Sequence, residues 1–392
     1  MPTDSPTRIS QRILAGLITA LVGYLSSFAV VLAGLQAVGA NAGEAASGLL
    51  ALTLTQAISG IILSWMSKMP ITTAWSTPGA ALLAGAGAMH FGWNEAVGAF
   101  IVSGVLILLT GLIPPLGRLI SAIPEKLAQA MLAGVLLQLC IAPFVALGSI
   151  PQFVGPVILV WLVVLSFAPR WAVPAAMAVA LGIAVVTSQT GHDAAASVSL
   201  LPHFEWIVPQ FTWEAMTGIA VPLFIVTMAS QNVPGVAVLK SFGYQAPWSA
   251  SMIATGTGTI AGAFAGGHAI NLAAISAALA AGDEAGPDKS KRWIAGVSSG
   301  FFYILIGLAS GLIVSISAAS PAGLIPAAAG LALLATLGAS ASSALSDPKQ
   351  RLSALITFLI AASGLSFAGL GAAFWALVAG LLVRAVIERK NL

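Results

Sequence analysis

Residues 68–87 read KMPITTAWSTPGAALLAGAG, and this stretch decides the fold. A lysine, two prolines and several hydroxyl residues interrupt a chain that is otherwise overwhelmingly apolar. The stretch before it, LLALTLTQAISGIIL at 49–63, is typical of a membrane helix, whereas GAALLAGAGA at 79–88 is only half as long as one needs to be. Irregular polar backbone is tolerated at membrane depth only where it is buried in protein or lines a cavity. We therefore expect Met69–Ser76 to be extended and buried at the centre of the molecule.

The residues around Pro78 predict the start of a short helix. Serine or threonine at the cap position and proline at the first helical position form a strong local start signal. We expect Ser76 or Thr77 to cap a half-helix that begins at Pro78. A matching segment, Gly266–Asn271, precedes a second expected half-helix over 272–282. The alternative is that 68–76 is an ordinary inner loop and 77–92 a short tilted span.

The composition identifies an integral membrane protein. The chain has 392 residues, of which 58% are hydrophobic and 7% charged, whereas soluble domains carry about 25% charged residues. The single cysteine, Cys140, excludes an intrachain disulfide and a cysteine-rich metal site. A formal charge of +3 does not indicate a nucleic-acid partner. We find no Walker loop, zinc-type spacing or catalytic triad signature, and so we expect no cofactor and no enzyme.

Apolar stretches recur along the whole chain. A membrane span needs roughly 20 consecutive, mostly apolar residues, or fewer where the helix is broken. The sequence predicts fourteen spans, in an all-α polytopic fold with short extended segments in spans 3 and 10. They cover 13–37, 45–67, 77–89, 95–113, 126–147, 152–167, 172–188, 214–236, 247–265, 270–282, 293–317, 322–340, 351–364 and 368–387.

The basic residues orient these spans. With the N-terminus inside and spans alternating, all 15 Lys and Arg residues fall on the inner side. The outer loops, including the longest at 189–213, contain histidines and acids but no Lys or Arg. Short loops follow this positive-inside distribution. We therefore expect both termini in the cytoplasm and a multi-pass protein of the cell inner membrane.

The two halves of the chain resemble each other in the order of their features. SSFAVVLAG, ISGIILSW and MPITTAWSTPGAALLAGAG in the first half correspond to ASQNVPGVAV, TIAGAFAGG and HAINLAAISAALAAG in the second. Seven spans in each half give the second half the opposite orientation. Inverted repeats with broken helices at matching positions are typical of secondary transporters, whose site lies near the bilayer midplane.

The segments MPITTAWSTPGAALLA, SQNVPGVAVLKSFGY and GGHAINLAAISAALAAG resemble the benzoate/proton symporters of the BenE family. That family is similar in architecture to nucleobase transporters such as UraA and to sulfate-type anion transporters. The resemblance implies a seven-plus-seven inverted repeat with a core domain and a gate domain. The core domain would comprise 12–113 and 214–317, and the gate domain 121–189 and 321–388. Strands in spans 3 and 10 would cross between the domains.

The matching positions in spans 8 and 10 differ from those of the nucleobase relatives, which carry acidic residues there. This chain has Gln231, Asn232, His268 and Asn271 instead. The difference fits an anionic substrate, because a buried carboxylate repels another in a low dielectric. Polar side chains inside spans are costly and often functional. The alternative for Gln231 and Asn232 is hydrogen bonding between helices.

The carboxylate of the substrate is expected at the two half-helix N-termini, because no Arg or Lys is expected at mid-membrane depth. Helix N-termini present free N–H groups and partial positive charge. The candidates are Ser76, Thr77 and Gly79 at the first end and Asn271 with Leu272 at the second.

Further candidates come from span 1 and from the aromatic residues. Ser26 and Ser27 occupy the place in span 1 that Gln231 and Asn232 occupy in span 8, with a packing role as the alternative. Phe28, Trp75 and Phe264 are candidates to flank an aromatic ring, although aromatic residues in membrane proteins usually serve packing.

His268 is the histidine that the predicted spans embed, and histidine changes charge near neutral pH. We expect it to carry the coupled proton, and the alternative is a neutral imidazole bonded to backbone. The leading hypothesis is proton-coupled uptake of benzoate or a similar aromatic carboxylate by relative movement of the core and gate domains. Alternatives are a nucleobase, another organic acid or an inorganic anion as substrate, an anion channel, and a membrane enzyme. A homo-oligomer is left open.

Overall fold

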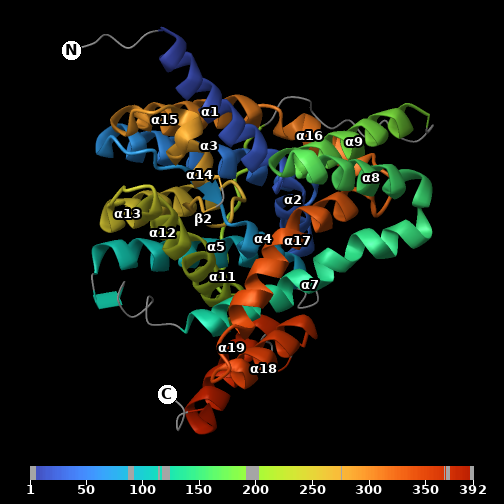
Figure 1. Cartoon of the computed structure of the whole chain (residues 1–392). Coiled ribbons are helices and arrows are strands. Elements are labelled where there is room, and N and C mark those ends of the chain that lie inside the picture. The colour runs from blue at the N-terminus through green and yellow to red at the C-terminus, as the bar shows by residue number, and fades with distance from the viewer. Residues whose placement is uncertain are drawn as a thin grey trace.

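The structure is a computed structural model that describes residues 6–86, 92–113, 115–116, 124–190, 203–274, 276–365, 367 and 371–388. Helices dominate it (Figure 1). The elements of the first half are α1 Pro6–Leu25, α2 Phe28–Ala37, α3 Ala42–Ser67, β1 Thr73–Trp75, α4 Thr77–Ala86, α5 Trp93–Leu112, α7 Glu125–Ser149, α8 Pro151–Phe167 and α9 Pro169–Thr190.

The second half begins with a helix that contains two π-helical turns, η2 and η3. Its elements are α10 Trp213–Ala215, η2 Met216–Ala220, α11 Val221–Thr227, η3 Met228–Asn232, α12 Val233–Ser241, α13 Trp248–Ala263, β2 Ile270–Leu272, α14 Ala277–Ala281, η4 Asp283–Ala285, η5 Lys289–Lys291, α15 Trp293–Gly307, α16 Ser310–Ala318, α17 Leu324–Leu345, α18 Arg351–Ala362 and α19 Ala372–Val386.

Many of these helices are apolar and long enough to cross a bilayer. Among the described residues, seven helical stretches meet that condition, and the pair Lys289–Gly307 and Ser310–Ala318, bent by 52°, makes an eighth when counted as one span. Three apolar helices are shorter, namely Pro151–Phe167, Arg351–Ala362 and Ala372–Val386. The protein is therefore a multi-pass membrane protein, and the count of fourteen spans stays a prediction.

The first predicted span, 13–37, is divided in the structure between α1 and α2. The hydroxyls of Ser26 and Ser27 both donate to the carbonyl oxygen of Gly23, at 3.1 and 3.0 Å. Serine hydroxyls that bond to a preceding carbonyl compete with the backbone hydrogen bonds of a helix. The two serines thus lie at a break in the helix, where the sequence predicted a continuous span.

The two strands lie side by side although almost two hundred residues separate them in sequence. β1 pairs antiparallel with β2, with Ala74 opposite Asn271. The pairing continues beyond the strands, because the N–H of Ser76 donates to Ala269 O and that of Ala273 donates to Thr72 O, both over 2.9 Å. The structure therefore has extended backbone in both places where the sequence predicts it.

The second half-helix was predicted over 272–282, and its predicted first residue is wrong. Leu272 belongs to β2, and the helix that follows, α14, spans only Ala277–Ala281. The reason is the pairing with β1, which engages the backbone N–H of Ala273 in a bond to Thr72. Asn271–Ala273 is consequently strand-like backbone and not a helix N-terminus.

The first half-helix starts close to its predicted position. α4 begins at Thr77, and the hydroxyl oxygen of Ser76 accepts the N–H of Gly79 over 3.1 Å. Of the two predicted caps, Ser76 fills the role. The predicted end of this helix, 87–89, lies outside the described residues.

The helices form two groups that pack chiefly within themselves. In the strand-bearing group, which comprises α1–α5, α10–α16 and both strands, α13 packs on α5, α15 on α3 and α2 on α4. In the α7–α17 group, which comprises α7–α9 and α17–α19, α7 packs on α17 and α18, and α8 on α9. Figure 1 shows α1, α3, α13 and α15 stacked on one side of the molecule and α8 and α9 on the other. The groups meet where α4 contacts α7, α1 contacts α9 and α2 contacts α17.

Candidate functional site

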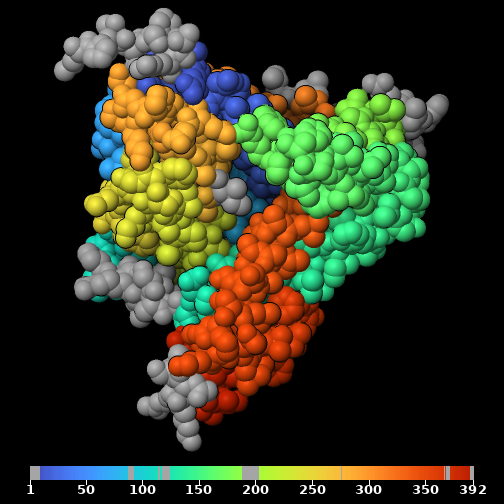
Figure 2. Space-filling view, in the orientation of Figure 1, coloured from blue at the N-terminus to red at the C-terminus, as the bar shows by residue number. Residues whose placement is uncertain are grey.

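A cavity of about 300 Å³ lies where the two groups meet. The strand-bearing group contributes residues of α1, β1, α4, η3 and the segment after β2, and the other group contributes residues of α7, α9 and α17. Its volume is at the lower end of the range for small-molecule sites, roughly 300–1,000 Å³. Figure 2 shows this face of the molecule hollowed between α13 and α15, in yellow and orange, and α9, in green.

Five residues that the sequence singles out line this cavity. They come from three stretches of the chain, around positions 26, 76 and 231, and they are Ser26, Ser27, Trp75, Thr77 and Gln231. The structure therefore brings together residues of the broken first span, the first strand, the first half-helix and the eighth predicted span. The remaining lining residues are largely apolar and include Val22, Leu136, Val173, Leu279 and Leu333.

Trp75 is fixed by an aromatic cluster behind the cavity. Its indole N–H donates to the hydroxyl oxygen of Ser27 over 2.8 Å. The ring of Tyr24 lies 5.0 Å from that of Trp75 and 5.7 Å from that of Phe28, measured between centroids. Tyr24 and Phe28 are fully buried. Phe28 therefore packs behind Tyr24 and supports the wall of the cavity without being among its lining residues.

The start of α4 is built around Ser76, which is fully buried. Its hydroxyl oxygen accepts the hydroxyl of Thr227 over 2.8 Å as well as the N–H of Gly79. A side chain at position 79 would force its neighbours to shift, because an added Cβ would lie 2.5 Å from Cδ1 of Leu223 and 2.7 Å from Oγ of Ser76. Ser76 and Gly79 thus shape the helix N-terminus, while the adjacent Thr77 and Pro78 line the cavity. The helix dipole makes this end partially positive.

The predicted residues around β2 bond to one another. Asn232 accepts the N–H of Leu272 through Oδ1 over 2.9 Å, and Asn271 donates to the carbonyl oxygen of Leu272 over 2.7 Å. All three are fully buried, and none is among the lining residues of the cavity. Gln231 and Asn232 both belong to the π-helical turn η3, a feature frequent at functional sites. Gln231 lines the cavity, and its neighbour Asn232 holds the strand.

His268 and Phe264 lie away from the cavity lining. His268 is fully buried, its Nδ1 lies 3.1 Å from Ala269 O, and its ring meets that of Phe100 edge-on at 6.3 Å. Its Nε2 has no hydrogen-bond partner among the described residues. The carbonyl oxygen of Ala269 also accepts the N–H of Ser76, so two hydrogen bonds to one oxygen link His268 to the cap of α4. Phe264 stacks on Trp206 with centroids 4.9 Å apart.

Arg170 also lines the cavity, whereas the sequence had pointed to no arginine or lysine as a candidate residue of the site. Among the described lining residues it is the one with a full charge. It is the second residue of α9, and its guanidinium forms an ion pair with the carboxylate of Glu284 in η4. The sequence places Arg170 in a short basic loop with nothing to distinguish it from other loop cations. Only its spatial neighbours reveal that it reaches the cavity.

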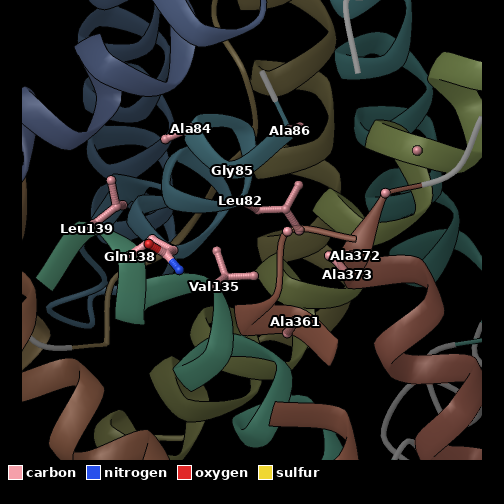
Figure 3. Close-up of a pocket in the computed structure, with 13 residues that line it drawn as sticks. Leu82, Ala84, Gly85, Ala86, Val135, Gln138, Leu139, Ala361, Ala372 and Ala373 are labelled. Atoms are coloured by element: carbon pink, nitrogen blue, oxygen red, sulfur yellow. The ribbon is translucent and has the colours of Figure 1, made fainter. Parts of the chain in front are cut away.

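A second, smaller cavity of about 130 Å³ lies at the same boundary, among α4, α7, α18 and α19. Figure 3 shows Leu82, Val135 and Leu139 around it, with the amide of Gln138 among these apolar side chains. That amide donates to the carbonyl oxygen of Ala362 over 3.1 Å. No charged side chain is among the described residues that line this cavity.

Comparison with known proteins places the chain among membrane transporters. Residues 6–386 match the family described as "BenE: Benzoate membrane transport protein". The chain is 41% identical over 369 residues to the "Inner membrane protein YdcO" of Escherichia coli K12, covering 94% of this chain and 93% of that protein. It is 33% identical over 378 residues to the "Benzoate membrane transport protein" of Acinetobacter baylyi, covering 96% and 95%.

Solved structures share the fold at low sequence identity. The transmembrane domain of the cyanobacterial bicarbonate transporter BicA matches 96% of this chain and 98% of its own, with a TM-score of 0.59 and 14% identity. The murine anion transporter Slc26a9 in its inward-facing state matches 99% of this chain and 70% of its own, with a TM-score of 0.69 and 14% identity. At this level of identity the likeness concerns the fold.

Proposed function

Because the chain belongs to the BenE family of benzoate membrane transport proteins, we propose that it carries benzoate or a similar aromatic carboxylate through the cavity between its two helix groups. The family is one of transporters, so the chain is a membrane transport protein and not an enzyme. The observation that carries the proposal is the composition of the cavity wall, which combines an indole ring, hydroxyl and amide groups and the N-terminus of α4.

These groups suit the two ends of an aromatic acid. The carboxylate is placed near Thr77, where the partial positive charge of α4 favours an anion. The amide of Gln231, from η3, supplies hydrogen-bond donors on the same wall, and the hydroxyl of Ser26 can donate there when it gives up its bond to Gly23 O. The apolar ring is placed against Trp75 and the apolar side chains of the wall. No Asp or Glu is among the described lining residues, so no carboxylate of the protein opposes that of the substrate.

The proposed transport is coupled to a proton held by His268. Uptake of an anion against an inside-negative potential is opposed by about 2.3 kcal/mol per charge per 100 mV, and one accompanying proton removes that opposition. The Nε2 of His268, which has no hydrogen-bond partner in the described part of the chain, offers a site for the proton. The ring and the backbone N–H of Ser76, the cap of α4, both bond to Ala269 O, so two hydrogen bonds link them. A buried positive charge is costly alone. A carboxylate at the helix N-terminus offsets that cost, so each ligand favours binding of the other.

The proposed movement is that of a core domain against a gate domain, as the resemblance implies. We assign the proposed core domain, 12–113 with 214–317, to the strand-bearing group, and the proposed gate domain, 121–189 with 321–388, to the α7–α17 group. The arrangement is proposed as fourteen spans with both termini in the cytoplasm. The relative in Escherichia coli is named an inner membrane protein, and we assign the same membrane to this chain.

An inorganic anion is the second candidate substrate, because the structural neighbours include a bicarbonate transporter and an anion transporter by name. The apolar wall and Trp75 favour the aromatic acid. Counterflow in proteoliposomes tests the proposal. Vesicles loaded with unlabelled benzoate are expected to accumulate labelled benzoate transiently, and excess unlabelled benzoate outside to suppress it. Suppression by bicarbonate or uracil but not by benzoate would contradict the proposed substrate, and uptake without counterflow would indicate a channel.

A further inference from the structure

The ion pair between Arg170 and Glu284 joins the two helix groups at the edge of the main cavity. Arg170 belongs to α9 of the α7–α17 group, and Glu284 belongs to η4 of the strand-bearing group. Only the arginine lines the cavity. The pair therefore connects a cation of the candidate site to an anion outside its wall.

The glutamate side of this pair is held in place by its surroundings. The buried guanidinium of Arg292 donates to Ala281 O, Gly286 O and the carboxylate of Asp283, over 2.6, 2.7 and 2.6 Å. These three bonds bracket the turn that carries Glu284. The backbone carbonyl of Glu284 also accepts the amide of Gln11 in α1 over 3.3 Å. The turn is thus fixed to its own group, whereas the long side chain of Arg170 is the adaptable partner.

Both side chains of the pair are partly exposed, and this makes the pair exchangeable. The side chain of Arg170 is 47% exposed and that of Glu284 is 48% exposed. Exposed ion pairs contribute little net stability, because water and salt screen them. A guanidinium can bind a carboxylate through two parallel hydrogen bonds, whichever molecule carries the carboxylate. The carboxylate of an aromatic acid is therefore chemically equivalent to that of Glu284 as a partner for Arg170.

We propose that Arg170 is a substrate-recruiting residue, which exchanges the carboxylate of Glu284 for that of the aromatic acid as the acid enters the cavity and stays bound to it there. The inference rests on the proposed function, because it requires an anionic substrate in this cavity. Glu284 is then an internal competitor that neutralises Arg170 when the cavity is empty. Release of the glutamate also frees one contact between the two groups, so substrate arrival and separation of the groups are linked.

Equilibrium binding of labelled benzoate to the purified full-length protein tests this exchange. Arg170→Gln is expected to weaken benzoate binding about tenfold, as befits loss of a charged hydrogen bond. Arg170→Lys keeps the positive charge but loses the planar guanidinium, so its benzoate affinity should lie between those of the wild type and Arg170→Gln. Glu284→Gln removes the competitor and should tighten binding severalfold. The opposite signs of Arg170→Gln and Glu284→Gln are the signature of competition.

Swapping the two charged residues distinguishes substrate recruitment from an ion pair that only holds the two helix groups together. The double variant Arg170→Glu with Glu284→Arg restores an ion pair between the groups but moves the cation away from the cavity wall. Recruitment predicts that its benzoate affinity stays at least as weak as that of Arg170→Gln, whereas recovery of wild-type affinity would overturn the proposal. Equal shifts of the same sign in Arg170→Gln and Glu284→Gln would overturn it as well. If the wild-type protein binds benzoate but the variants do not show the expected changes in affinity, the proposed function stands and the exchange is wrong. Absence of benzoate binding by the wild type would overturn both.

Discussion

The indole N–H of Trp75 donates to the hydroxyl oxygen of Ser27 over 2.8 Å, and this bond joins strand β1 to the break between α1 and α2. The hydroxyl of Ser27 in turn donates to the carbonyl oxygen of Gly23 over 3.0 Å. One chain of bonds thus connects the backbone of α1, through a serine, to the aromatic wall of the cavity. Two segments nearly fifty residues apart are held in one arrangement by it.

Trp75→Phe tests the bond while keeping an aromatic ring. We expect benzoate affinity to fall about three- to tenfold, because Ser27 loses its donor and the ring its fixed orientation. Ser27→Ala should lower benzoate affinity by a similar factor. The double variant should lower it little further, since both single changes remove the same bond. Equilibrium binding measures all three. Trp206→Phe is the control, because Trp206 stacks on Phe264 outside the cavity lining. Full additivity of the two losses would show that the bond is not shared.

Gln231→Glu places a carboxylate on the cavity wall. We expect it to weaken benzoate binding much more than Gln231→Ala does, because like charges repel strongly where water is excluded. Gln138→Ala in the smaller cavity is the matched control and should bind benzoate as the wild type does. A competition assay with labelled benzoate compares the variants. Equal affinities of Gln231→Glu and Gln231→Ala would place the substrate carboxylate away from η3.

Ser76→Ala removes the cap of α4. We expect the free energy of unfolding to fall by about 1 kcal/mol for the lost cap alone. Thr227→Val leaves the cap in place and removes only the hydroxyl that donates to Ser76, so its cost should be smaller. Thermal unfolding of the purified protein in one detergent ranks the two variants. A larger loss in Thr227→Val would mean that the contact between α11 and α4 matters more than the cap.

His268→Gln preserves hydrogen bonding but removes titration. We expect the variant to lose accumulation of benzoate driven by a pH gradient while it retains exchange of benzoate across the membrane. Proteoliposomes with an imposed pH gradient measure the first, and counterflow without a gradient measures the second. Accumulation that persists with the wild-type pH profile would assign the proton to another group. Wild-type protein in vesicles without a gradient is the reference for both assays.

Single cysteines test the predicted topology. Cys140 is buried in α7, and Cys140→Ala provides a background without thiols. Two variants are then made, His203→Cys in the predicted outer loop and Asp288→Cys in a predicted inner loop. Each is labelled with an impermeant maleimide in spheroplasts, whose outer membrane is removed and whose inner membrane is sealed. We expect the cysteine at position 203 to react and that at position 288 to react only after permeabilisation. Reaction of both from outside would contradict the odd number of spans between them and the inverted repeat.

The sequence alone determined the environment of the chain and the places where its helices fail. An apolar content of 58% permits only a membrane protein, and the serine and proline before Gly79 start α4 wherever the rest of the fold lies. These features depend on neighbours within four residues or on bulk composition. Ser26 and Gln231 were identifiable because polar groups inside apolar spans are costly and conspicuous, and Trp75 because it lies in the polar stretch that interrupts the apolar sequence.

Only the tertiary structure decided which polar groups face the cavity and which bond to each other. Asn271 and Asn232 looked like Gln231 in sequence, yet they hold β2: Asn232 accepts the N–H of Leu272, and Asn271 donates to the carbonyl oxygen of Leu272. Pairing with β1 continues through the N–H of Ala273, so this segment is no helix N-terminus. Arg170 looked like an ordinary loop cation, and its place on the cavity wall depends on α9 meeting α1 and on Glu284, more than a hundred residues away. Local sequence sets the intrinsic preference of each segment, whereas hydrogen-bond partners and charge partners are fixed only when distant segments pack together.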